Sequence, residues 1–199
     1  IMVRIRIRGL AIFRSVLFIP QILSTVVVAI AWRWIYDLDG PLNALLTAVG
    51  LGDLATAWLG NFDTALASVG FIGTWVQFGL CMMLFLAGAQ RIPVELYESA
   101  RIDGANAVQE FFTVTVPGVR AELRIALFLT CVFALRNFDI VWNTTSGGPG
   151  TSTTVPSVYI YQGAFLTREV GMAATVAVVL TLLIIVVVSA VQFLLRERK

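Results

Sequence analysis

Histidine is absent from this chain of 199 residues, and charged residues are scarce. The first absence removes the commonest general base and the commonest metal ligand of proteins. Only 13% of the residues are charged, whereas soluble domains carry about a quarter. Hydrophobic residues, in contrast, make up 58% of the chain, and the mean hydropathy is +0.88. This balance indicates an integral membrane protein.

Cysteine is rare as well. Cys81 and Cys131 lie alone inside apolar runs, with no CxxC or similar spacing, so we interpret them as packing residues and predict no metal site. The sequence also lacks a GxxxxGK[ST] phosphate loop, so any use of ATP requires a partner. The net charge of +2 is too small to suggest a nucleic-acid partner, and no pattern indicates a cofactor.

Four apolar runs are long enough to cross a bilayer, which takes about 20 helical residues. They cover approximately residues 15–34, 65–90, 125–142 and 171–195. Pro20 is expected to kink the first run, and the third is the least uniform because Arg136, Asn137 and Asp139 lie toward its end. The predicted fold is all-α, a polytopic transmembrane helical bundle that forms one domain over residues 1–199.

The basic residues orient these spans. Eleven of the 14 precede the first span, lie between the second and third, or follow the fourth, whereas the loop after the first span carries four aspartates and no Lys or Arg. By the positive-inside rule, both chain ends and the segment at 91–117 face the cytoplasm. The start at Ile1 has no secretory-signal pattern. We therefore expect a fragment that lacks one or more earlier spans.

The segment at 91–117 is a polar, helix-forming insert between two apolar spans. Pro93 suits the first helical position, and an apolar stripe follows at helical spacing. The stripe consists of Tyr97, Ala100, Gly104, Val108 and Phe111. Gly104 permits a tight turn, so we predict two short helices that bend there and an end at Pro117. Arg101 is the only basic residue between the two prolines, which favours docking to a protein over docking to anionic lipid.

The insert resembles the EAA loop of binding-protein-dependent ABC importers. Glu98, Ser99 and Ala100 stand for the EAA triplet, Gly104 follows four residues later, and Pro117 closes the pattern. Ser99 for the middle alanine, and a valine for the usual leucine before Pro117, are mild departures. Further matches to the sugar-importer subfamily lie in residues 13–32, 86–93, 137–139, 145–153 and 159–165. Within it, the chain is similar to the first of two paired permeases, the maltose/glycerol-phosphate F/A type, whose members have two more preceding spans.

This resemblance implies a type I ABC importer permease core in the inner (plasma) membrane, and a transport subunit rather than an enzyme. It would form half of a sugar pore with a second, different permease. Cytoplasmic ATP-binding subunits would bind the loop, and an extracytoplasmic solute-binding protein would deliver the sugar. The implied ATPase-coupling residues are Glu98, Ser99, Ala100, Asp103, Gly104 and Pro117.

The polar end of the third span offers candidates for the substrate path. Asn137 can hydrogen-bond sugar hydroxyls and Trp142 can stack on a sugar ring, while Arg136 and Asp139 are spaced to pair on one helical face. The alternative is that all four lie near the outer headgroups. Residues 146–150 are predicted to form an outer turn.

Two other function classes stay open from the residues alone. An intramembrane enzyme would use Glu95, Glu98 or Asp103 as acid and base, although no nucleophile–base pair supports it. A passive channel or structural membrane subunit would need no nucleotide.

Overall fold

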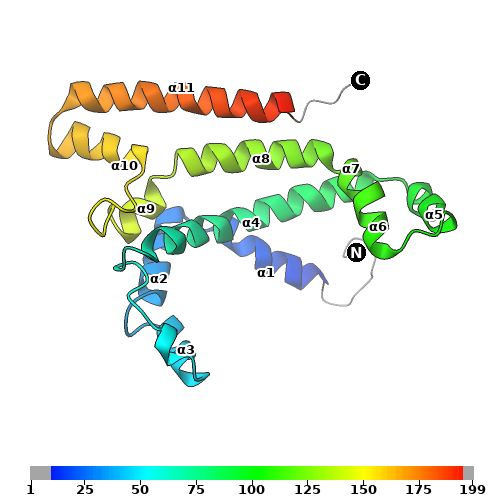
Figure 1. The fold of residues 1–199 in the computed structure, drawn as a ribbon, viewed down its shortest axis with the longest axis horizontal. Helices are drawn as coiled ribbons and strands as arrows, with labels where there is room; N and C mark the ends of the chain where they lie inside the picture. Colours follow the sequence, from blue (N-terminus) through cyan, green and yellow to red (C-terminus); the bar gives the residue numbers. More distant parts are fainter. Residues whose placement is uncertain (1–9, 195–199) are drawn as a thin grey trace.

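The computed structural model describes residues 10–194, and the side chains of residues 12–193. The described residues contain helices and irregular segments but no strand, as the all-α prediction requires. Three long helices lie side by side in Figure 1, and α8 packs against both of the others. They are α4 (Ala65–Arg91), α8 (Arg120–Leu135) and α11 (Val170–Leu194). The chain ends, and with them six of the basic residues that set the predicted orientation, lie outside the described residues.

Two of the described helices, α4 and α11, are long and apolar enough to cross a membrane. A third candidate exists if a bent pair forms one span, namely α1 (Leu10–Ile22) followed by α2 (Thr25–Ile35). Along α11 the apolar side chains are largely exposed, which suits a helix that faces lipid. The bounds of α4 and α11 lie within a residue of the runs predicted at 65–90 and 171–195.

The bend in the first run differs from the predicted kink at Pro20. α1 continues through Pro20 to Ile22, and α2 then departs at 102° after a break of two residues. A proline removes only its own bond to the preceding turn, and α1 tolerates that loss. The direction changes where Ser24 adopts an extended conformation, with ψ of 133°, ahead of α2. The new direction packs α2 against α9 (Asp139–Thr144).

The run predicted at 125–142 is also divided, so it is not one helix. α8 begins five residues earlier than predicted and ends at Leu135, and α9 starts only at Asp139. At 16 residues, α8 is shorter than the roughly 20 that a straight crossing takes. The break at residues 136–138 coincides with the polar sequence that made this run the least uniform.

The buried core lies where α2, α4, α9 and α10 (Pro156–Tyr161) meet. Its members are Val28, Tyr36, Val69, Ile72, Val76, Ile140, Val141 and Val158. The core is therefore at one end of α4, beside the acidic loop that holds α3 (Pro41–Ala48) and the short η1 (Gly52–Leu54). The predicted insert lies at the opposite end of α4 (Figure 1).

Candidate functional site

The insert consists of short helices between α4 and α8. They are α5 (Val94–Ile102), α6 (Ala107–Glu110), the π-helical turn η2 (Phe111–Thr115) and α7 (Val116–Gly118). The predicted bend is confirmed, because α5 ends just before Gly104, whose φ is +81°, and α6 starts just after it. In Figure 1, α5 and α6 extend beyond the ends of the long helices.

Both prolines of the insert differ slightly from their predicted roles. Pro93 caps α5 from outside, and the helix begins one residue later. Pro117 lies within α7, which continues the helical backbone of η2, so this proline does not end the insert. The chain turns into α8 only at Val119, whose φ and ψ are −101° and 16°.

Side-chain bonds fasten the two short helices to each other. The Arg101 guanidinium donates two hydrogen bonds to the Glu110 carboxylate, and this carboxylate raises the pKa of Arg101 above its ordinary value. The Tyr97 and Thr115 hydroxyls lie 2.9 Å apart, so they bond α5 to η2. The insert is therefore a cross-linked unit and not a loose loop.

A capping box starts α6. The Asn106 side chain accepts the backbone N–H groups of Val108 and Gln109, both at 3.0 Å, and the Gln109 side chain accepts the Asn106 N–H at 2.8 Å. Sequence reasoning missed this box and the Arg101–Glu110 pair. The Asn-x-x-Gln spacing was a sufficient signal for the first, whereas the second depends on how the chain turns at Gly104.

The predicted coupling residues divide into two groups. A hollow of about 590 Å³ lies between α5 and the η2–α7 segment, and four of them line it. They are Ser99, Ala100, Asp103 and Pro117. Glu98 and Gly104 are exposed on the insert but do not line this hollow. Apolar side chains are exposed beside them, with Ile102 at 86%.

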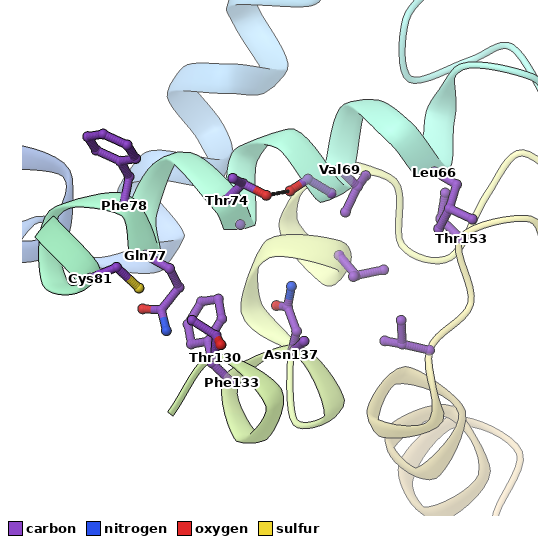
Figure 2. Close-up of a pocket in the computed structure, with 15 residues that line it drawn as sticks. Leu66, Val69, Thr74, Gln77, Phe78, Cys81, Thr130, Phe133, Asn137 and Thr153 are labelled. Atoms are coloured by element: carbon purple, nitrogen blue, oxygen red, sulfur yellow. Dashed lines mark hydrogen bonds between the residues drawn. The ribbon is translucent and has the colours of Figure 1, made fainter. Parts of the chain in front are cut away.

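Asn137 lies in the break between α8 and α9 and lines a cavity of about 420 Å³. Figure 2 shows Gln77 of α4 and Asn137 pointing into the same space from different elements. Gln77 is only 8% exposed, and sequence reasoning missed it, although a lone amide inside an apolar run was a usable signal. Thr74 and Thr130 add hydroxyls to the cavity wall.

A neighbouring cavity of about 400 Å³ is lined by Arg136, Asn137 and Asp139. The pairing that the spacing of Arg136 and Asp139 allowed is not formed, because α8 ends at Leu135, before both residues, and no ion pair joins them among the described residues. The Asp139 carboxylate instead accepts the Thr25 hydroxyl at 2.9 Å.

Trp142 does not line either cavity. Its ring stacks on Phe138 at 5.7 Å between centroids and meets Tyr161 edge-on at 4.8 Å. It therefore supports the wall that carries Asn137 and Asp139. Residues 146–150 form a turn, as predicted, with positive φ at Ser146, Gly147 and Gly150.

Exposed apolar helices, a bent first helix and a helical insert at one end define an all-helical, polytopic membrane fold. A family described as the binding-protein-dependent transport system inner membrane component matches residues 3–199. The chain belongs to this family. Membership assigns it to the transport components of ABC transporters rather than to the enzymes.

Similar proteins agree with this assignment. The probable ABC transporter permease protein YurN of Bacillus subtilis is 40% identical over 181 residues, which are 90% of this chain and 62% of YurN. The diacetylchitobiose uptake system permease protein NgcF of Streptomyces coelicolor is 34% identical over 194 residues, 96% of this chain and 55% of NgcF. The chain thus spans about three fifths of the length of the curated relatives it matches.

A crystal structure of a bacterial ABC transporter involved in the import of the acidic polysaccharide alginate has the same fold. One of its chains superposes with a TM-score of 0.84 at 21% identity and covers all of this chain, which in turn covers 70% of it.

Proposed function

We propose that the chain is a permease subunit of an ATP-driven ABC importer, and that it forms half of a pore for sugar uptake. NgcF, and the multiple sugar-binding transport system permease protein MsmF of Streptococcus mutans (32% identical over 193 residues), support a carbohydrate substrate. Within this class we assign the chain to the first-permease, maltose/glycerol-phosphate F/A type. Its partner in the pore is a second, different permease, so the two form a heterodimer.

The insert carries the proposal. It is compact, internally bonded and attached to two long helices, and it exposes apolar side chains outside the bundle. These properties suit a docking element that a soluble partner binds and that transmits the partner's movement to the attached helices. We assign the cytoplasmic ATP-binding subunits as that partner, and Glu98, Ser99, Ala100, Asp103, Gly104 and Pro117 as the coupling residues. An extracytoplasmic solute-binding protein delivers the sugar to the outer face of the permease, opposite the insert.

The proposed topology places the insert and both chain ends in the cytoplasm and the α3 loop outside. The exposed aspartates of that loop support this orientation, since they lie at the opposite end of α4 from Arg91 and Arg120.

The two cavities beside Asn137 are the proposed substrate path. Amide groups donate and accept hydrogen bonds, which suits the paired donor and acceptor character of sugar hydroxyls. Asn137 and Asp139 would contact the sugar directly, Gln77 would bind it from α4, and Trp142 would hold the wall in place.

The test is a charge reversal on the insert, Glu98→Lys, in the full-length permease assembled with its partners. ATP-driven uptake should fall roughly tenfold or more, as is typical when a central interface residue is replaced. Glu169→Lys is the matched control, because Glu169 is an exposed carboxylate outside the insert. Full uptake by a correctly inserted Glu98→Lys protein would contradict the proposal.

A further inference from the structure

The insert joins the bundle through a narrow neck, where the chain leaves α4 and returns to α8. The neck residues are Gly88, Arg91, Ile92, Gly118 and Glu122. We infer that these contacts lock α4, the insert and α8 into one rigid lever, with Gly88 and Glu122 as its main positioning residues. This inference rests on the proposed function, to which it adds a structural device.

The first neck contact joins Glu122 of α8 to the backbone of α4. A Cβ atom on Gly88 would lie 2.7 Å from both Cγ and Oε2 of Glu122, so a larger residue at this position would displace the Glu122 side chain from its place on α4. The Glu122 side chain is 12% exposed, and Arg91 Nη1 lies 3.8 Å from Oε1. Because Arg91 is exposed, the charge attraction is weak, and the close fit on Gly88 is what sets the spacing of the two helices.

The second neck contact closes the loop from the other side. Ile92 is buried, and its side chain fills the space over Gly118, where a Cβ atom would lie 2.8 Å from Cγ1. Gly118 has an ordinary helical backbone in α7, so glycine serves here to make space. Each contact joins a residue that precedes α5 to a residue at the end of α7 or in the first turn of α8.

The neck contacts determine whether movement of the insert is transmitted to α4 and α8. Residues 92–93 and Val119 are the non-helical points at which the insert could swivel on the long helices. The contacts of Ile92 with Gly118 and of Glu122 with Gly88 restrain these two points. Inside the insert, hydrogen bonds join Arg101 to Glu110 and Tyr97 to Thr115. A force applied to α5 is therefore transmitted to α4 and α8 together.

The experiment measures the spacing of the two helices and the transport yield in the same preparation. Spin labels are placed at Gln90 and Ala121, which are exposed at the adjoining ends of α4 and α8, in the assembled transporter with Cys81 and Cys131 replaced by alanine. We expect one narrow distance distribution that is the same with and without ATP. Gly88→Val and, independently, Glu122→Ala should each broaden this distance distribution and lower uptake per ATP hydrolysed roughly fivefold. The first variant overpacks the contact and the second leaves a cavity in it, and both disturb a close fit.

Gly171→Val is the matched control, because a Cβ on Gly171 meets nothing within 4 Å, and it should change neither quantity. A distribution in the unsubstituted transporter that shifts with ATP would overturn the lever, since the neck would then open. Unchanged distances and yield in both neck variants would also overturn it. An absence of ATP-driven uptake in the unsubstituted transporter would refute the proposed function. The distances between the spin labels would still test whether the neck contacts hold α4 and α8 at a fixed spacing.

Discussion

Gly104 shows how one residue sets the shape of the insert. Its φ of +81° belongs to the left-handed region, and a Cβ there would meet nothing within 4 Å. Backbone conformation, and not space, is therefore what requires glycine at this position.

Substitution of Gly104 should follow backbone preference. Gly104→Asn is expected to retain most uptake because asparagine tolerates this conformation, whereas Gly104→Val should strain the turn by about 1–3 kcal/mol and abolish most uptake. Uptake by membrane vesicles with equal permease content shows whether the asparagine variant is more active than the valine variant. Equal uptake by the two variants would show that the bend is not needed.

The Arg101–Glu110 pair leads to a prediction about pH. The carboxylate raises the pKa of Arg101, so the contribution of this arginine is fully present below its ordinary pKa and is lost only as pH rises through the higher folded value. Coupled uptake should therefore not depend on Arg101 titration between about pH 6 and 9. Glu110→Gln should lower uptake equally across that range, and a loss confined to its alkaline end would contradict this assignment.

At the scale of elements, Asn43 organises the acidic loop around α3. Its amide donates to the carbonyls of Leu38 and Thr56, both at 3.0 Å, and its oxygen accepts the Trp58 indole N–H at 2.8 Å. The side chain is 4% exposed, so its partners have no ready access to water if it is removed.

Asn43→Ala should cost about 1–3 kcal/mol, the usual penalty for leaving buried polar groups unpaired. Asn43→Asp keeps the acceptor for Trp58 but loses the donors, so it should be intermediate. Limited proteolysis of the loop and thermal unfolding of the purified transporter rank the stability of the wild type and the two variants. Wild-type resistance in the alanine variant would contradict this role.

The elements also show what sequence can and cannot predict. Apolar length located α4 and α11, and the glycine and proline positions predicted the two-helix insert. Apolar length carries no information on direction, so it missed the bend after Ile22, which depends on packing α2 against the distant α9. Helical spacing also allowed an Arg136–Asp139 pair that does not form, because the helix ends at Leu135 and the spacing no longer applies beyond it.

At the scale of the whole molecule, the two ends of α4 differ in chemistry. One end carries the buried core and the loop with four aspartates, and the other carries the insert and the neck. Exposed apolar helices connect them. The proposed function needs this polarity, because an importer receives its solute on one side of the membrane and its energy on the other.

The side of the membrane that the insert faces is the most direct test. A membrane-impermeant thiol reagent is applied to intact cells that carry Glu98→Cys in a permease whose own cysteines are replaced by alanine, with Asp53→Cys as the control for outside access. We predict labelling at position 53 in intact cells and at position 98 only after the membrane is opened. Labelling at position 98 in intact cells would contradict the account, since no cytoplasmic ATPase reaches a site exposed to the outside.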